Sequence, residues 1–223
     1  MFRRIFLTGI LAGLLAGIVA GALGAVKLTP LIAAAERYEA ATPGHAHDDA
    51  GWEPAPGLER AGLTMLAKSI IGVGFGLLLS AGFALRQIVG GAETGLSHGV
   101  LWGIAGFACF SLAPALGLPP ELPGSVSADL LARQGWWLGT ALATAAGIGL
   151  LVFARRHSWR IVGVIVILLP HLAGAPHPPV EGGAAPAGLA AEFAAASLAV
   201  AAVFWIVLGS AGGWLYQRLG RSG

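Results

Sequence analysis

The sequence predicts an all-α integral membrane protein, a helical bundle with about six transmembrane helices and five as the alternative count. Of the 223 residues, 56% are hydrophobic and only 11% are charged, whereas a soluble domain carries about 25% charged residues. Several apolar stretches also approach 20 residues, the length that crosses a bilayer. The 35 glycines fit membrane helices that pack closely through small side chains. We therefore expect a single membrane domain over residues 1–223.

The first expected span is Ile5–Val26, which contains no charged residue. Arg3 and Arg4 precede it and an A-x-A-like sequence lies near Ala25, so a signal peptide is the alternative interpretation. The apolar run is longer than a typical signal-peptide core, which favours a retained helix. One helical face would carry a glycine every four residues, at Gly9, Gly13, Gly17 and Gly21.

The other expected spans are Leu63–Leu85, His98–Leu118, Trp136–Ala154, Ile161–Pro176 and Phe193–Leu215. Lys68 lies close enough to the start of its span to reach the interface. Gly72 and Gly76 repeat the small-residue spacing of the first span. The stretch Ile161–Pro176 is short and contains Pro170 near its end, and it is the reason for the alternative count of five.

The distribution of arginine predicts the orientation. With six spans, the amino terminus, residues 86–97, residues 155–160 and residues 217–223 share one side. Eight arginines lie there: Arg3, Arg4, Arg86, Arg155, Arg156, Arg160, Arg218 and Arg221. The positive-inside rule then places both termini in the cytoplasm and residues 27–62 in an extracytoplasmic loop between the first two spans. Every acidic residue except Glu93 falls on the outer side.

The loop 27–62 contains the strongest candidate for metal binding. A short helix is expected from Pro30 to Glu39, followed by the ligand-type residues His45, His47, Asp48 and Asp49. Imidazole nitrogens with carboxylate oxygens suit divalent first-row ions such as Co²⁺, Ni²⁺, Zn²⁺ or Cu²⁺. A solvated polar loop with incidental histidines is the equally weighted alternative.

His171 and His177 form a second candidate, at the outer end of the fifth expected span. An ionisable side chain at membrane depth is costly, which makes a functional role the default hypothesis. The alternative for His171 is a helix-end histidine bonded to a carbonyl freed by Pro170. His98 could be an exit ligand but suits an interfacial position better, and His157 belongs to a topogenic arginine cluster.

The ends of the third and fifth spans resemble each other, which indicates a weak internal repeat. Leu112–Gly124 reads LAPALGLPPELPG and Leu169–Gly183 reads LPHLAGAPHPPVEGG. Both contain an early Pro-x-Leu, a later Pro-Pro and then a Glu, although Pro- and Gly-rich exits also look alike by chance. Glu121 and Asp129, between the third and fourth spans, could attract cations or simply be solvated.

Other functional classes lack support in the sequence. It has no nucleotide-binding P-loop and no H-E-x-x-H, G-x-S-x-G or C-x-x-C-H motif, so an enzyme and an organic cofactor are not expected. The arginines form no basic patch for nucleic acid. The single cysteine, Cys109, excludes a disulfide framework. A haem shared by His98 and His171 is disfavoured because the predicted topology puts them at opposite membrane faces.

Several segments resemble the CbtA family. They are MFRRIFLTGILAGLLAG at the start, Gly95–Gly124, Ala128–Gly147, the PHLAGAP segment Pro170–Pro176, and FWIVLGSAGGWLY at Phe204–Tyr216. LPPELPG and PHLAGAP are the most specific of them. The similarity covers most of the chain but not the GHAHDD element of the outer loop, so the ligand assignments above come from the residues alone.

The resemblance implies a cobalt transporter subunit in the bacterial inner membrane, linked to cobalamin biosynthesis. It also implies two partners within the membrane: the lipid bilayer itself and a small single-span subunit, CbtB. We therefore expect Co²⁺ as the transported ion, with Ni²⁺ as a further possibility, captured by the outward His and Asp groups. The alternative is a membrane-anchored protein that binds or senses a divalent metal without transporting it.

Overall fold

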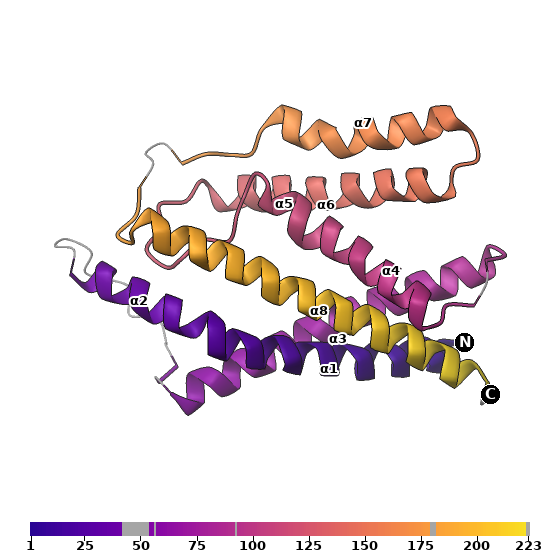
Figure 1. The fold of residues 1–223 in the computed structure, drawn as a ribbon, viewed down its shortest axis with the longest axis horizontal. Helices are drawn as coiled ribbons and strands as arrows, with labels where there is room; N and C mark the ends of the chain where they lie inside the picture. Colours follow the sequence, from indigo (N-terminus) through magenta and orange to yellow (C-terminus); the bar gives the residue numbers. More distant parts are fainter. Residues whose placement is uncertain (42–53, 56, 92, 179–181, 222–223) are drawn as a thin grey trace. The chain divides into compact units, whose positions relative to one another are not determined.

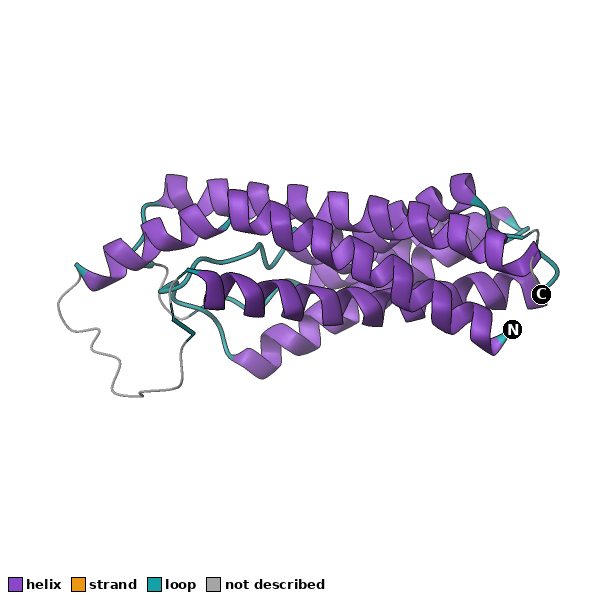
Figure 2. Cartoon of the chain, turned by 90° about the horizontal axis from the view of Figure 1, so that it is seen from below, coloured by secondary structure: helices purple, strands orange, loops and turns teal. Residues whose placement is uncertain are grey.

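The computed structural model describes residues 1–41, 54–55, 57–91, 93–178 and 182–221. Figure 2 draws the regular secondary structure of these residues as helix, so the predicted all-α class is confirmed. The helices are α1 (Phe2–Lys27), α2 (Thr29–Ala40), α3 (Leu58–Ile88), α4 (Leu96–Phe107), the π-helix η1 (Ala108–Leu112), α5 (Ala113–Ala115), α6 (Leu130–Phe153), α7 (His157–Ala173) and α8 (Ala187–Arg221) (Figure 1). The short helix expected from Pro30 to Glu39 is present as α2.

Five helical stretches are long and apolar enough to cross a membrane: α1, α3, Leu96–Ala115, α6 and α8. They correspond to five of the expected spans. The sixth expected span, Ile161–Pro176, forms α7, which begins at His157, ends at Ala173 and has 17 residues. At 1.5 Å per residue, a helix of this length measures about 26 Å, a little less than the roughly 30 Å hydrocarbon core.

Large apolar side chains lie on the outside of these helices, including Leu11, Leu15 and Ile18 on α1, Ile70 and Leu78 on α3, and Leu168 and Leu169 on α7. A soluble monomer rarely exposes contiguous apolar surface on this scale. In a bilayer the same surface faces lipid tails, which are equally apolar. Small residues such as Gly13, Gly17 and Gly72, by contrast, are buried between helices, as expected when packing rather than hydrophobicity holds membrane helices together.

The chain divides into two compact units. Unit 1 comprises the described residues of 1–30, 46–104 and 199–223, and unit 2 comprises those of 31–45 and 105–198. Unit 1 therefore contains α1, α3, the first part of α4 and the last part of α8. Unit 2 contains most of α2, together with η1, α5, α6, α7 and the start of α8.

In unit 1, α1 packs antiparallel against α3 through backbone-to-backbone contact. A Cβ added at Gly17 would lie 2.6 Å from the carbonyl oxygen of Lys68, and one added at Gly9 would lie 2.8 Å from the Leu77 backbone. Gly13 faces Gly72 in the same way, and Gly21 faces the side chain of Met65. The glycine face predicted for the first span is confirmed, and its partner is the small-residue face of the second.

A second antiparallel contact in unit 1 joins α4 to α8. A Cβ added at Gly99 would lie 2.8 Å from the Cα of Gly213, and one added at Gly209 would lie 2.8 Å from the Cα of Gly103. Aromatic side chains from α3, α4 and α8 also contact one another in unit 1. The ring centroid of Phe83 lies 5.7 Å from that of Trp102 and 5.6 Å from that of Tyr216, both edge-on, the favoured geometry for aromatic pairs.

In unit 2, α6 and α7 form an antiparallel hairpin, seen as two adjacent helices in Figure 1. A Cβ added at Gly147 would lie 2.6 Å from the carbonyl oxygen of Gly163. At the other end of the hairpin, the indole Nε1 of Trp136 donates a hydrogen bond of 3.2 Å to the carbonyl of Pro170. Gly174 ends α7 with a φ of 85°, a conformation that favours glycine.

The π-helix η1 ends at Leu112, two residues before Pro114. Proline has no N–H and its ring clashes with the carbonyl four residues earlier, which here belongs to Phe110. Widening the preceding turn relieves that clash: the N–H of Ala113 bonds to the carbonyl of Ala108, five residues back. Local π geometry of this kind is one way in which membrane helices accommodate proline.

Candidate functional site

The predicted capture residues His45, His47, Asp48 and Asp49 lie outside the described residues. Their role as metal ligands therefore stays a prediction. Among the described residues, no group of three or more His, Cys, Asp or Glu side chains lies close enough together to hold a metal ion. The described histidines and carboxylates thus supply at most part of a metal site.

His171 lies in the last turn of α7 and is half-buried. Its ring packs edge-on against Trp136, with centroids 5.8 Å apart. The same indole donates to Pro170, so Trp136 holds the end of α7 by two adjacent contacts. His177 is exposed in the segment that follows α7. The structure thus places both histidines at the end of unit 2 where α7 terminates and α6 begins.

The two proline-rich exits meet at this end of unit 2. Ser125 and Gly183 form an isolated antiparallel bridge, and the N–H of Val126 donates to the carbonyl of Gly182 at 3.2 Å. These residues directly follow or end the two segments whose sequences resemble each other. The bridge therefore brings the ends of the two similar segments together within unit 2.

The two carboxylates between α5 and α6 have structural partners. Glu121 accepts hydrogen bonds from Arg133 at 2.7 Å and from Ser127 at 2.6 Å. Asp129 is the N-cap of α6, accepting a bond of 2.9 Å from the N–H of Ala132. Both groups therefore stabilise the start of α6, one by pairing its charge and one by capping.

Buried hydroxyl groups without partners provide a further polar feature of unit 2. Thr140 and Thr144 stand one turn apart on α6 and are almost fully buried. Within the described part of the chain, neither hydroxyl has a hydrogen-bond partner. Thr140 lies one turn from Trp136, so the two hydroxyls continue inward from the helix face that contacts His171. A buried hydroxyl left unpaired costs free energy, which makes this face suited to water or to an ion.

The opposite end of unit 2 is basic. Arg155 and Arg156 lie between α6 and α7, and Arg160 stands in the first turn of α7, all of them exposed. His157, the first residue of α7, is also exposed within this cluster. In unit 1, Arg3 and Arg4 at the start of α1, Arg86 at the end of α3, and Arg218 at the end of α8 are similarly placed at helix ends.

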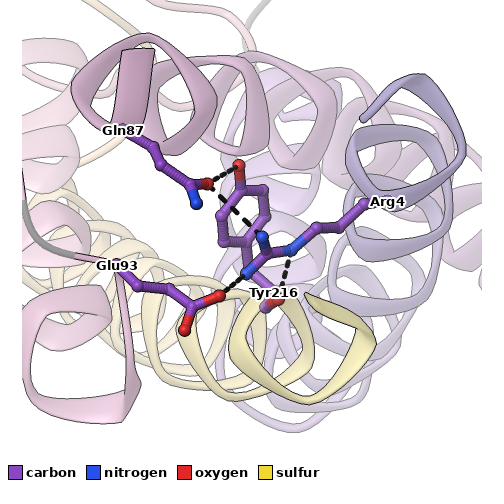
Figure 3. A network of polar contacts seen from close by, with 4 residues as sticks. All are labelled: Arg4, Gln87, Glu93 and Tyr216. Atoms are coloured by element: carbon purple, nitrogen blue, oxygen red, sulfur yellow. Dashed lines mark hydrogen bonds and ion pairs between the residues drawn. The ribbon is translucent and has the colours of Figure 1, made fainter. Parts of the chain in front are cut away.

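Unit 1 contains a polar network that sequence reasoning did not predict (Figure 3). Its centre is the guanidinium of Arg4, which donates to the main-chain carbonyl of Tyr216 at 2.5 Å and to Gln87 Oε1 at 3.3 Å. Its third donor forms a short ion pair with Glu93. The Tyr216 hydroxyl also donates to Gln87 Oε1, at 3.0 Å. We call these four residues, Arg4, Gln87, Glu93 and Tyr216, the Arg4 network.

The Arg4 network joins the ends of four helices. Arg4 stands in the first turn of α1, Gln87 in the last turn of α3, Glu93 just before α4, and Tyr216 near the end of α8. The guanidinium also lies over the Tyr216 ring, with Cζ 3.7 Å from the centroid, a cation–π arrangement. The side chains of Arg4 and Glu93 are only 14% and 35% exposed. One sequence signal pointed here: in the topology predicted from the sequence, Glu93 is the one acidic residue assigned to the arginine-rich side.

Several outward-facing apolar helices, with glycine faces turned inward, define a polytopic membrane protein. The chain matches the family model described as "Probable cobalt transporter subunit (CbtA)" over residues 2–217, and it belongs to that family. The resemblance noted from the segments above is therefore confirmed along almost the whole chain. No curated protein and no solved structure matches the chain.

Proposed function

We propose that the protein carries cobalt into the cell across the bacterial inner membrane and thereby supplies cobalamin biosynthesis. The observation that carries this proposal is the family match over residues 2–217, in a chain with five helices able to cross a membrane. Co²⁺ is the transported ion in this proposal, and Ni²⁺ is a chemically similar second substrate. The protein acts as a subunit, beside a small single-span partner of the CbtB kind.

The proposed orientation has six spans, both termini in the cytoplasm and residues 27–62 outside. Unit 2 supports it, because Arg155, Arg156 and Arg160 gather at one end of the α6–α7 hairpin while His171 and Glu121 lie at the other. Unit 1 also gathers arginines at one set of helix ends. Lys and Arg are retained on the cytoplasmic side during membrane insertion. The short helix α7 crosses in this arrangement as one arm of the hairpin.

In the proposed mechanism, His45, His47, Asp48 and Asp49 capture the ion outside. Neutral imidazoles and carboxylates are suitable first ligands for Co²⁺. His171, half-buried against Trp136, then receives the ion at the membrane surface, with His177 beside it in sequence. The unpartnered hydroxyls of Thr140 and Thr144 on the next turns of α6 offer oxygen atoms further inward. Enzymatic chemistry plays no part in this scheme.

Uptake of radioactive cobalt tests the proposal. Cells lacking the gene are complemented with the wild type, with H45A/H47A or with H171A, and uptake is measured at sub-saturating cobalt. We expect the wild type to restore uptake and each ligand variant to reduce it by about tenfold or more, since even the loss of outer-shell partners costs about 10–100-fold in metal affinity.

His157→Ala is the matched control, because His157 is exposed at the basic end of unit 2 and has no role in the mechanism. Uptake that does not depend on the gene would overturn the proposed function. Purified protein in vesicles separates transport from mere binding: cobalt that is bound but never accumulates would instead identify a membrane-anchored metal-binding or sensing protein.

A further inference from the structure

We propose that the oxygen atoms around Arg4 form a cation-binding pocket that the guanidinium fills, and that a divalent cation replaces it when Arg4 withdraws. The pocket lies within unit 1, at the end where α1 begins and α8 finishes (Figure 3). Its role as the last station of cobalt before the cytoplasm rests on the proposed function. The binding of a cation in the pocket does not.

The oxygen atoms that contact the guanidinium are of the chemical kinds that bind divalent cations in proteins. Arg4 contacts a carboxylate oxygen of Glu93, the amide oxygen of Gln87 and the main-chain carbonyl oxygen of Tyr216. Carboxylate, amide and carbonyl oxygens form the usual ligand set of hard divalent ions. The three contacts use separate donor nitrogens of one planar group, so Arg4 acts as a tethered cation in an oxygen-lined pocket.

The charge balance favours exchange over simple release. In the intact pair the side chains of Arg4 and Glu93 are 14% and 35% exposed, so withdrawal of Arg4 alone would take from the Glu93 carboxylate the cation that pairs with it. Removing one member of a partly covered ion pair is unfavourable, because the remaining charge loses its partner while some of its surface stays shielded from water. An incoming cation restores neutrality at the same place. Entry of the ion and departure of Arg4 are therefore coupled.

Two buried hydroxyl groups belong to residues that are near members of the Arg4 network in the chain, and we propose them as additional oxygen ligands. Thr8 stands one turn beyond Arg4 on α1, and Thr94 directly follows Glu93; both are completely buried. Among the described residues, neither hydroxyl has a hydrogen-bond partner. Native proteins rarely leave buried polar groups unpaired, and such groups call for an explanation such as an ion or water. In this proposal, a cation in the pocket is the explanation for the unpaired hydroxyls of both Thr8 and Thr94.

Gly220 keeps the pocket open on the side of α8. A Cβ at this position would lie 2.6 Å from Glu93 Oε1 and would also collide with the Arg4 guanidinium. Any side chain at position 220 would therefore occupy the space next to the Glu93 carboxylate in which the cation lies. The glycine gives the carboxylate and its cation the space they share.

The donor set also determines selectivity. Oxygen ligands bind Mg²⁺, Ca²⁺ and Mn²⁺ readily, and they do not favour cobalt as imidazole does. The pocket should therefore bind Co²⁺ weakly and lose it to excess Mg²⁺. A weak site is suited to release, because conduction requires that an ion can leave as well as enter. Selection for cobalt then depends on the histidine ligands of the proposed uptake mechanism.

Equilibrium dialysis of purified protein in detergent, with Co²⁺ as the probe, tests the pocket. We compare Arg4→Ala with Arg3→Ala, a matched control that removes the same charge from an exposed neighbour on the same helix. Arg4→Ala should gain one weak cobalt site per chain that Arg3→Ala lacks. Excess Mg²⁺ should abolish the gain, and so should adding Glu93→Gln.

The proposal is overturned if folded Arg4→Ala binds no more cobalt than Arg3→Ala, if Arg4→Ala/Glu93→Gln keeps the extra site, or if Mg²⁺ fails to displace it. Circular dichroism and gel filtration establish folding. Should Arg4→Ala not fold, the wild type decides: millimolar Co²⁺ should increase the modification of Arg4 by phenylglyoxal relative to Arg3, read by mass spectrometry. Unchanged modification overturns the pocket.

These outcomes are independent of the uptake experiment. Wild-type cells that fail to accumulate cobalt would refute the proposed function, yet the dialysis result for Arg4→Ala would still stand. Conversely, normal uptake by the wild type with no added site in Arg4→Ala would refute the pocket alone.

Discussion

Gly72 and Gly74 stand two residues apart on α3, but their surroundings differ completely. A Cβ at Gly72 would collide with the carbonyl of Gly13 on α1 and lie 3.2 Å from the N of Gly17, whereas a Cβ at Gly74 meets nothing within 4 Å. The difference follows from helical periodicity: the two positions face directions about 200° apart. Only one of these glycines is needed for close packing.

We therefore expect Gly72→Ala to destabilise the protein by about 1–3 kcal/mol, the usual cost of overpacking. Gly74→Ala should be neutral or slightly stabilising, because alanine is the better helix former. Unfolding of the purified protein in mixed detergent, followed by circular dichroism, measures both. Equal effects of the two substitutions would contradict the backbone contact between α1 and α3.

The roles of some residues can be predicted from the sequence, whereas the roles of others become apparent only in the folded structure. The glycine face of α1 could be predicted because it repeats at a fixed spacing. The Arg4 network could not, because its members are up to 212 positions apart and follow no period. Arg4 alone reads as a topogenic charge. The capture residues from His45 to Asp49 remain a prediction from residue type.

At the scale of elements, the α6–α7 hairpin depends on one indole. Trp136 donates to the carbonyl of Pro170 and packs against the ring of His171. We expect Trp136→Phe to keep the ring contact but lose the hydrogen bond, and to destabilise the hairpin by about 1 kcal/mol. Hydrogen exchange of the α7 amides should accelerate, since it reports local opening.

Trp159→Phe serves as the control for this change. Trp159 lies in the first turn of the same helix and is largely exposed. Its replacement should leave the exchange of the α7 amides near its wild-type rate. Equal acceleration in both variants would show that the contact of Trp136 with Pro170 does not hold the hairpin.

The elements themselves were largely predictable, and their ends were not. Apolar runs near 20 residues located α1, α3, α6 and α8 because the bilayer fixes the length of a span. The helices extend beyond those runs: α3 begins at Leu58 rather than Leu63, and α8 begins at Ala187 rather than Phe193. Hydropathy marks where the bilayer lies, whereas helical hydrogen bonding continues past it. The π-turn before Pro114 followed from neither signal.

For the whole molecule, the proposed six-span topology predicts on which side of the membrane each loop lies, and reporter fusions can test this. Alkaline phosphatase needs an oxidising compartment for its disulfides and is active only outside the cytoplasm. Fusions after Gly124 and after Gly183 should be active, and fusions after Arg156 and after Arg221 should be inactive. Fusions to green fluorescent protein at the same sites should give the reciprocal result.

The fusion after Gly183 bears on α7 specifically. Activity there requires that this 17-residue helix crosses the membrane, and an inactive fusion would contradict the six-span arrangement. An active fusion after Arg221 would contradict a cytoplasmic carboxyl terminus. The arginine distribution predicts the orientation, but the division into two units was not visible in the sequence, because each unit combines segments that are far apart in the chain.

The Arg4 network also imposes an order on biogenesis. A ribosome adds about 5–20 residues per second, so the 212 positions that separate Arg4 from Tyr216 correspond to between roughly 10 and 40 s of synthesis. Until the end of α8 enters the membrane, the guanidinium lacks both the carbonyl and the ring of Tyr216. The α6–α7 hairpin, whose arms are adjacent in sequence, is free to form first. In a nascent chain, α1 therefore lacks the contacts between Arg4 and Tyr216 until α8, the last helix to be synthesised, has been inserted.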